Sequence, residues 1–453
     1  MKELFDVAIV GSGFAGSLLA LVARRIGLSV VLLEKGSHPR FAIGESTSPL
    51  TNLMLESLAT RYSLPRLLPL TKWGLWQATY PGIGSGLKRG FTFFGHEDGR
   101  PFANLGNGRD RHLVPASPRD AVADTHWYRP DVDAFLVKEA ADAGVDYRDH
   151  FALHAVDRSG AVWDIEGKRD GTPAAFSARF VVDATGRETA LAKTLNAPLA
   201  FSAGMPATQA LFSHFAGVRR LDSMAEFGTT AEPPYPLDDA AVHHVFEGGW
   251  IWVLRFANGI TSAGVAATEA LARDLDFAAG EPAWRRLLDR FPSIRAQFQD
   301  ARALRAFDHC PRVAFRRARA AGPGWALLPS AAAFADPLLS TGFPLTLLGI
   351  NRLASALKED FGTPRLDSRL GDYEADTLQE ADRTAAFVGS LYPVFGDFPR
   401  FVERASLYFR AAESVESIAR AHLSGDSSRP IAFLDLPGQI EVSASCATSS
   451  APA

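Results

Sequence analysis

Three glycines and one acid near the N-terminus have the types and spacing that suit a bound dinucleotide. The glycines are Gly11, Gly13 and Gly16. They follow an apolar run at residues 6–10, and Glu34 ends the next apolar run. The first glycine permits a tight turn, the second lets a pyrophosphate approach the backbone, and the third lets helix and strand pack closely. The acid accepts hydrogen bonds from ribose hydroxyls, so the spacing predicts a dinucleotide site.

A strand, a helix and a second strand are needed to hold these residues. The sequence predicts a strand at residues 6–10, a helix at residues 17–25 and a second strand at residues 29–33. The N-terminus of such a helix offers free N–H groups and a positive dipole end to phosphates. We therefore expect an α/β chain with a Rossmann-like cofactor-binding domain. Neighbouring residues expected to share the contact are Phe14, Ala15 and Lys35.

Composition places the chain among ordinary globular proteins with a large core. Of its 453 residues 47% are hydrophobic and 22% charged, and the net charge is −4. The lack of a basic excess argues against nucleic acid as a partner. No apolar run reaches 18 residues, and the first strand closely follows Met1, so we expect no membrane span and no signal peptide. Two cysteines, Cys310 and Cys446, make neither a disulfide framework nor a zinc site, which favours a reducing cytoplasm.

The rest of the chain divides into strand-rich and helix-rich stretches. Strands are predicted at residues 87–94, 209–215, 241–246, 250–256 and 259–266, and a loop at residues 95–122. Helices are predicted at residues 46–80, 131–143, 269–291, 349–358 and 372–421. We expect a discontinuous cofactor domain at residues 1–200 and 320–360, split by an antiparallel sheet at 201–319 that covers a ligand. A helical region at 361–440 and a disordered tail at 441–453 complete the expected organisation.

A second turn identifies the expected dinucleotide as FAD by resemblance. A hydrophobic strand ends in Asp183, and Gly186 follows in the turn. Beside the first glycine motif, this segment resembles the second signature turn of the FAD-dependent monooxygenase-like family, which implies cofactor contacts at both residues. After a later strand that family has Gly-Asp, where this chain has Pro329 and Ser330. The resemblance then implies that this contact is weakened or moves to a hydroxyl or backbone group.

Five further segments together resemble flavin-dependent halogenases. Residues 41–49 resemble the family's G-E-S-T-x-P stretch, and residues 334–342 match its F-x-x-P-x-x-S-x-G pattern. Residues 87–93 resemble its lysine strand, and residues 249–255 resemble its W-x-W-x-I-P signature. Residues 124–136 resemble its R-x-x-x-D helix start. The resemblance spans roughly residues 5–360 and is specific in combination.

The halogenase resemblance implies a reaction. In that family reduced FAD activates dioxygen, a halide is oxidised to hypohalous acid, and a lysine delivers this oxidant to an aromatic ring. The implied catalytic residues are Lys88 and Ser340. The implied additional cofactor contacts are Glu45, Ser46, Arg129, Asp336 and Pro337. Chloride or bromide is implied at Thr341 and Gly342, and Trp250 and Trp252 are implied as the tunnel wall beside the flavin.

Each of these residues also has a structural interpretation when taken alone. A single lysine such as Lys88 is usually a solvated surface charge. Aromatic residues on one face of a strand, such as Trp250 and Trp252, are usually core. His126 is interpreted as hydrogen-bonded or exposed, with a general base as the alternative. Only the combination with residues 334–342 favours the catalytic interpretation.

Two features bear on the substrate and the reductant. Tryptophan-type halogenases carry a Glu just before the serine of the last motif, where this chain has Leu339. The resemblance then implies an electron-rich ring, namely a phenol, resorcinol or pyrrole, either free or bound to a carrier protein. No second nucleotide-binding unit is visible, since the glycines at 82, 84 and 86 lack the flanking strand and helix. We therefore expect a separate NAD(P)H-dependent flavin reductase.

Two alternatives remain open on the sequence. Leu254 and Arg255 replace the Ile-Pro of the family's signature. This change, with Pro329 and Ser330, leaves a flavin monooxygenase or dehydrogenase of the same fold as a second hypothesis, with an aromatic or polyketide-like substrate. The third hypothesis is a non-catalytic flavoprotein whose aromatic C-terminal helices surround a ligand.

Overall fold

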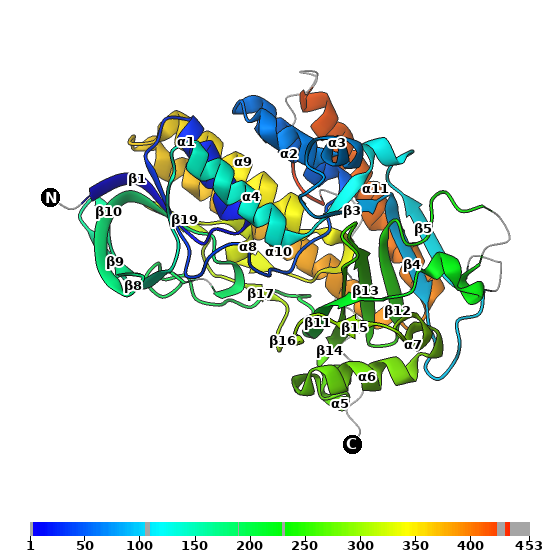
Figure 1. Ribbon diagram of the computed structural model, residues 1–453. Helices are drawn as coiled ribbons and strands as arrows, with labels where there is room; N and C mark the ends of the chain where they lie inside the picture. Colours follow the sequence, from blue (N-terminus) through cyan, green and yellow to red (C-terminus); the bar gives the residue numbers. More distant parts are fainter. Residues whose placement is uncertain (1–2, 105–108, 189, 229–231, 424–430, 435–453) are drawn as a thin grey trace.

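Two eight-stranded sheets lie side by side in the computed structural model, and long helices cover them (Figure 1). The structure describes residues 3–104, 109–188, 190–228, 232–423 and 431–434. The expected tail at 441–453 and Cys446 lie outside these residues. The arrangement confirms the predicted α/β fold with a Rossmann-like domain, a second sheet and a helical C-terminal region.

The first sheet carries the glycine motif. Its central strands run β19-β10-β1-β2, all mutually parallel, and their apolar residues are buried because helices cover the sheet. Helix α1 (Phe14–Arg25) starts directly after the turn that leaves β1. The strands are β1 (Glu3–Val10), β2 (Val30–Leu33), β7 (Asp146–Arg148), β8 (Phe151–Ser159), β9 (Val162–Arg169), β10 (Thr172–Asp183), β18 (Ala321–Gly322) and β19 (Trp325–Leu327).

The second sheet runs in the order β15-β11-β14-β13-β12-β4-β5, with β16 beside β11. Most neighbours are antiparallel, but β12 and β4 are parallel, so the sheet is mixed rather than purely antiparallel as predicted. It also includes β4 and β5, which come from residues 90–115, far before the other strands of the sheet. The strands are β4 (Gly90–Gly95), β5 (Arg111–Pro115), β11 (Thr208–Ala216), β12 (Ala241–Phe246), β13 (Gly249–Arg255), β14 (Thr261–Thr268), β15 (Arg302–Ala303) and β16 (Asp308–Cys310).

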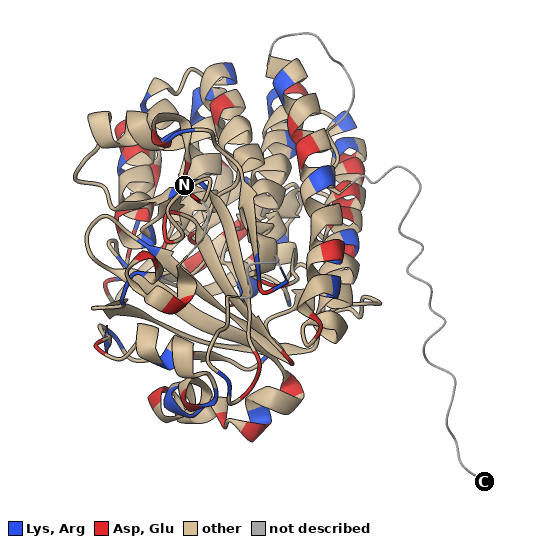
Figure 2. Ribbon diagram, turned by 90° about the vertical axis from the view of Figure 1, so that its right-hand side faces the viewer, with Lys and Arg blue, Asp and Glu red and all other residues tan. Residues whose placement is uncertain are grey.

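Helices pack over both sheets. Helices α1, α4, α9 and α10 run alongside the first sheet, and α5, α6 and α7 lie at the far side of the second (Figure 1). Acidic and basic residues are interspersed along the helices (Figure 2). The remaining helices are α2 (Pro49–Arg61), α3 (Trp73–Thr79), α4 (Arg129–Asp142), α5 (Glu269–Asp274), α6 (Glu281–Arg290), α7 (Pro292–Gln297), α8 (Pro329–Ala332), α9 (Gly342–Asp360), α10 (Arg365–Leu391) and α11 (Phe398–Leu423).

Several predicted element boundaries were wrong. The strand expected at 87–94 is two strands, β3 (Ser85–Lys88) and β4, which separate at Arg89 and join different sheets. The loop expected at 95–122 contains β5, a partly exposed edge strand with little apolar signal. The helix expected at 269–291 is interrupted, because Asp276 and Gly280 adopt positive φ values of 53° and 69°. Helix α9 starts at Gly342, seven residues earlier than expected.

Two small pairs of strands complete the described fold. β3 pairs with β6 (Asp124–Trp127), and β17 (Phe315–Arg316) pairs with β20 (Ala333–Phe334). Within the described residues, no helix is both long enough and apolar enough to cross a membrane.

Candidate active site

A cavity of about 340 Å³ brings together many residues singled out in the sequence. Its wall draws on α1, the loop before α2, strand β13 and the segment that leads into α9. The sequence-predicted residues in this wall are Phe14, Glu45, Ser46, Arg129, Trp250, Trp252, Pro337, Ser340, Thr341 and Gly342. Segments hundreds of residues apart in the chain therefore share one chamber.

The glycine turn has the shape that a pyrophosphate needs. A Cβ on Gly13 would meet nothing closer than 3.6 Å, and its nearest neighbours would be the Arg129 and Arg40 guanidinium groups. Gly13 is also the N-cap of α1 and has no side-chain cap bond, so the first N–H groups of the helix are open to a phosphate. The other glycines pack on protein, because a Cβ on Gly16 would lie 1.9 Å from the Gly11 carbonyl oxygen. The segment therefore fits a dinucleotide.

Glu34 lies where the ribose contact was predicted. It is buried at the end of β2 and accepts hydrogen bonds from Ser12 N–H at 3.2 Å and Ser12 Oγ at 2.9 Å. It also accepts from Gly36 N–H at 3.1 Å and Arg40 Nη2 at 3.0 Å. Burial opposes ionisation, but the Gly36 N–H and the Arg40 charge keep the pKa of Glu34 below its usual value. Glu34 is thus an ionised acceptor.

Arg129 fixes the loop that carries Glu45 and Ser46. Its guanidinium donates two 2.8 Å hydrogen bonds to Asp133, one turn along α4. It also donates to the carbonyls of Ile43 at 3.0 Å and Gly44 at 2.9 Å. The R-x-x-x-D pair therefore holds the loop beside the glycine turn.

Lys88 is a fully buried residue at the end of β3, which excludes the surface-charge interpretation. Its ammonium donates to Ser46 Oγ at 2.9 Å, to Ser340 Oγ at 3.5 Å and to the Thr47 carbonyl. It also lies 3.9 Å from the centroid of the Phe91 ring. Burial lowers the pKa of Lys88 to about 7, against the opposing pull of the Asp124 carboxylate. The lysine therefore contacts two serines of the cavity wall, and burial there works against its charged form.

The turn before α9 is strained and held from several sides. Leu339 and Ser340 have positive φ values of 65° and 57°, which cost about 1–3 kcal/mol each for non-glycine residues. Asp336 Oδ1 accepts from Leu338 N–H at 3.0 Å, and Tyr408 Oη donates to the Leu339 carbonyl at 3.0 Å. These bonds orient the backbone that enters Thr341 and Gly342, where the halide was predicted.

The two tryptophans form one side of the cavity. Their ring centroids lie 5.7 Å apart, and His243 stacks on Trp250 at 5.1 Å. Trp250 Nε1 donates to Tyr392 Oη at 3.3 Å, and that hydroxyl donates to Asp336 Oδ2 at 2.8 Å. A chain of hydrogen bonds therefore links the tryptophan strand to the turn that ends at Ser340.

Some predicted cofactor residues stand away from the cavity wall. Both Asp183 and Asp336 are fully buried. The carboxylate of Asp183 accepts hydrogen bonds from the N–H and the hydroxyl of Thr185 and from Leu191 N–H. Gly186 supplies a positive φ of 68° to the same turn. Lys35 is exposed, and Ala15 is buried inside α1. The two aspartates hold the turns in which they lie, and their contacts with the cofactor stay predictions.

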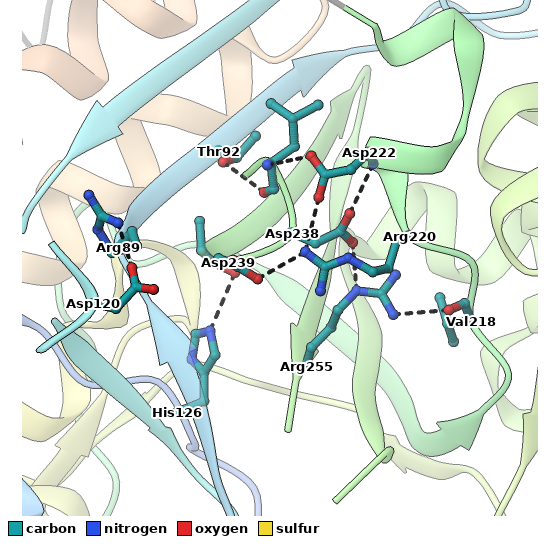
Figure 3. Close-up of polar contacts among 12 residues, drawn as sticks. Arg89, Thr92, Asp120, His126, Val218, Arg220, Asp222, Asp238, Asp239 and Arg255 are labelled. Atoms are coloured by element: carbon teal, nitrogen blue, oxygen red, sulfur yellow. Dashed lines mark hydrogen bonds and ion pairs between the residues drawn. The ribbon is translucent and has the colours of Figure 1, made fainter. Parts of the chain in front are cut away.

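The departures from the family patterns have structural explanations. Leu254 faces the cavity, whereas Arg255 ends β13 and pairs with buried Asp238 at 2.5 Å (Figure 3). Arg255 also donates to the Val218 carbonyl at 2.9 Å, so it ties the strand end to a neighbouring loop. Pro329 and Ser330 begin α8 and line the cavity, so this segment still faces the site.

Sequence reasoning missed Arg40, and it considered Tyr392 and Tyr408 only in the third hypothesis, as aromatic residues around a ligand. Arg40 stands beside Gly13, and Tyr392 and Tyr408 reach the turn from the C-terminal helices. Each depends on contacts between distant segments, and no local motif marks it. His126 is fully buried and donates from Nε2 to the Ala240 carbonyl at 3.3 Å (Figure 3), which confirms that it is hydrogen-bonded and excludes the exposed alternative.

Comparison with known proteins identifies the family. The FAD dependent oxidoreductase family model matches residues 6–333. Monodechloroaminopyrrolnitrin halogenase PrnC of Pseudomonas fluorescens is 31% identical over 422 residues, which cover 87% of this chain and 69% of PrnC. The chain belongs to the flavin-dependent halogenases.

Further relatives agree with this assignment. Tetracycline 7-halogenase of Kitasatospora aureofaciens is 29% identical over 451 residues, which cover 96% of this halogenase and 79% of that protein. The crystal structure of halogenase PltM in complex with phloroglucinol and FAD matches with a TM-score of 0.83 at 25% identity, covering 93% of this chain and 84% of PltM. The halogenase is therefore an FAD enzyme that uses halide, as predicted.

The Tyr408 hydrogen bond gives a testable prediction about the halide site that the sequence predicts at Thr341 and Gly342. Tyr408→Phe leaves the buried Leu339 carbonyl without this donor, which is expected to relax the strained turn and cost about 1–3 kcal/mol of stability. We expect the KM for bromide to rise about tenfold, with a smaller change in kcat. Steady-state halogenation over a range of bromide concentrations measures both.

Tyr373→Phe is the matched control. Tyr373 is also buried and also donates to a backbone carbonyl, but to that of Leu327 in β19, at 2.6 Å. It should lose similar stability and keep the KM for bromide. Equal KM changes in the two variants would mean that Tyr408 acts only on global stability.

Proposed function

We propose that this halogenase chlorinates or brominates a small, electron-rich aromatic ring such as a phenol, resorcinol or pyrrole. The observation that carries the proposal is the fully buried Lys88, whose ammonium contacts Ser46 and Ser340 where the cofactor loop, the β3 strand and the last motif meet. A surface or core-filling lysine would not need this arrangement.

The cofactor and the halide have matching places in this proposal. The Gly13 turn, Glu34, Arg40 and Arg129 would hold FAD, and the backbone at Thr341 and Gly342 would hold the halide through N–H groups. When bound, reduced FAD supplies the two electrons with which dioxygen and a proton convert halide to hypohalous acid and water. The protein's own residues orient this oxidant and exclude competing water.

Lys88 would present the oxidant to the ring. An ammonium donates hydrogen bonds and can polarise the oxygen of hypohalous acid. The ring carbon then bonds to the halogen while the halogen–oxygen bond breaks, and the departing hydroxide combines with the ring proton as water. Trp250 and Trp252 would form the wall that separates the cofactor from the ring.

The surroundings of Lys88 favour an uncharged, reactive substrate. Leu339 supplies no carboxylate to assist the reaction. Burial lowers the pKa values of His126 and His243 to about 3, so both imidazoles are neutral. The names of the relatives point the same way: PltM was crystallised with phloroglucinol, and other relatives are named as halogenases of carrier-bound pyrrole. We propose that free phenols and carrier-bound pyrroles are the classes to test first.

A flavin reductase would act in trans. We propose that it reduces FAD with NAD(P)H and that the reaction takes place in the cytoplasm. The cavity described above has Phe14 of the glycine motif in its wall, and the sequence offers no second Rossmann-like motif for a nicotinamide.

Product mass spectrometry tests the function. The protein is incubated with FAD, a flavin reductase, NADH and bromide, together with phloroglucinol, resorcinol or a pyrrole on its carrier protein. We expect the mass and isotope pattern of a brominated ring. Omission of the reductase should abolish product even with excess NADPH, and omission of halide should do the same. A hydroxylated or dehydrogenated product formed regardless of halide would instead support the monooxygenase or dehydrogenase hypothesis.

A further inference from the structure

A second buried charge lies opposite Lys88. Lys88 and Asp124 are partners in the antiparallel β3–β6 ladder, and their exposed fractions are 0% and 4%. Residues directly opposite in such a ladder point to the same face, with Cβ atoms about 4.5–5.5 Å apart. The carboxylate is therefore built into the immediate surroundings of the lysine by the strand register.

Within the described residues, one oxygen of the Asp124 carboxylate accepts a hydrogen bond and the other has no partner. Asp124 Oδ1 accepts a 2.6 Å hydrogen bond from Asn52 of α2. Asp124 Oδ2 is buried and has no hydrogen-bond partner within the described residues. The Lys88 ammonium instead contacts Ser46, Thr47 and Ser340. The pair is thus close enough to interact through charge while the ammonium faces the cavity wall.

We propose that Asp124 is a positioning residue that keeps Lys88 in its charged, hydrogen-bond-donating form. Asp124 does so from β6, opposite Lys88 in the strand ladder. This inference rests on the relay role proposed for Lys88.

The other groups near the pair do not substitute for this charge. His126 of β6 and His243 of β12 are neutral, and each would be disfavoured further as a cation by the lysine. On the far side, Glu416 and Arg420 of α11 act on Asp124 in opposite directions. Among the charged groups of the described chain, Asp124 is the one that raises the pKa of Lys88.

The opposite charges of Lys88 and Asp124 determine the direction in which the pKa of Lys88 changes when the carboxylate is removed. Burial lowers the pKa of the Lys88 ammonium, and the Asp124 carboxylate opposes that shift. Burial raises the pKa of Asp124, and the Lys88 ammonium opposes that shift in turn. Removing the carboxylate must therefore lower the pKa of Lys88 further, so that the ammonium is lost at a lower pH.

The test measures the protonation of Lys88 directly. The full-length protein with bound FAD is labelled with lysine carrying ¹³C at Cε, and Lys88→Met assigns the resonance. In Asp124→Asn the amide oxygen can still accept the Asn52 bond, so the fold is expected to persist. We expect the pKa of Lys88 to fall by about 1–3 pH units, the range for loss of a nearby opposite charge. Asp124→Glu should restore most of the shift.

Asp238→Asn is the matched control, because Asp238 is also a buried aspartate but pairs with Arg255. It should leave the Lys88 titration unchanged. An unchanged or raised pKa of Lys88 in Asp124→Asn would overturn the inference.

The halogenation rate provides a second readout. If the ammonium is the active form, the alkaline limb of the pH profile should move to lower pH in Asp124→Asn by the same amount as the resonance. A shifted resonance with an unshifted profile would confirm the charge coupling and overturn the relay role of Lys88. The resonance therefore tests the role of Asp124, and the pH profile tests the relay role of Lys88, so one proposal can be wrong without the other.

Discussion

Replacing Lys88 with alanine is expected to lower the rate of ring halogenation by about 10²–10⁴-fold, the usual contribution of one positioned acid or base. The protein should still bind FAD and consume dioxygen with a flavin reductase. The physical reason is the set of groups that Lys88 contacts: its ammonium donates to Ser46 and Ser340, whereas the charged groups beside Gly13 are Arg129 and Arg40. Product formation and oxygen uptake are measured in the same reaction.

Three variants separate this role from packing. Lys88→Met keeps most of the buried volume and should fail as Lys88→Ala does. Lys88→Arg should fail as well, because a guanidinium is bulkier than an ammonium and presents its donors in a rigid planar fork rather than from one point. Lys72→Ala removes a partly exposed lysine that pairs with Glu56 at 3.8 Å, and it should keep normal activity. Near wild-type halogenation by Lys88→Ala would mean that the lysine is structural and that the proposed mechanism is wrong.

The sequence predicted those parts of the fold that depend on local pattern. The glycine turn sits between β1 and α1, and β12 coincides with the predicted strand at 241–246. Both carry their signal within a few residues, as glycine spacing or an unbroken apolar run. The split at Arg89 carries no such signal. It follows from Arg89 N–H bonding to the Asp239 carbonyl and from the close approach of Gly90 to Val114, which both depend on distant segments.

In the candidate site, too, the sequence predicted the residues that local motifs mark and missed those that depend on distant segments. The motifs brought Lys88, Ser46 and Ser340 to attention, and the structure places them in contact. Asp124 and Tyr408 could not be found this way, because their importance comes from a strand register and a helix contact rather than from spacing along the chain. A motif names the groups that react, whereas the groups that tune them are selected by the packing of the whole fold.

A substitution at Gly13 should abolish FAD binding, whereas Lys88→Ala should leave FAD binding intact. Gly13→Val should weaken FAD binding by about 100-fold or more, which corresponds to about 2.7 kcal/mol. The side chain would occupy the space between the Arg129 and Arg40 guanidinium groups, where a pyrophosphate would approach the backbone. Fluorescence titration of the apoprotein with FAD measures the affinity.

Among the three glycines of the motif, Gly13 is the one at which a valine tests FAD binding without straining the protein fold. Its φ of −63° and ψ of 176° suit any residue, and a Cβ there would meet nothing closer than 3.6 Å. The Gly13→Val apoprotein should therefore fold, and its Tm should equal that of the wild-type apoprotein. Valine at Gly16 would instead strike the Gly11 carbonyl, and valine at Gly11 would be strained by a φ of 101°. Gly82→Val is the control, since a Cβ at Gly82 has no heavy atom within 4 Å and the segment lacks the strand-turn-helix context. Wild-type FAD affinity in Gly13→Val would show that the pyrophosphate does not pass this turn.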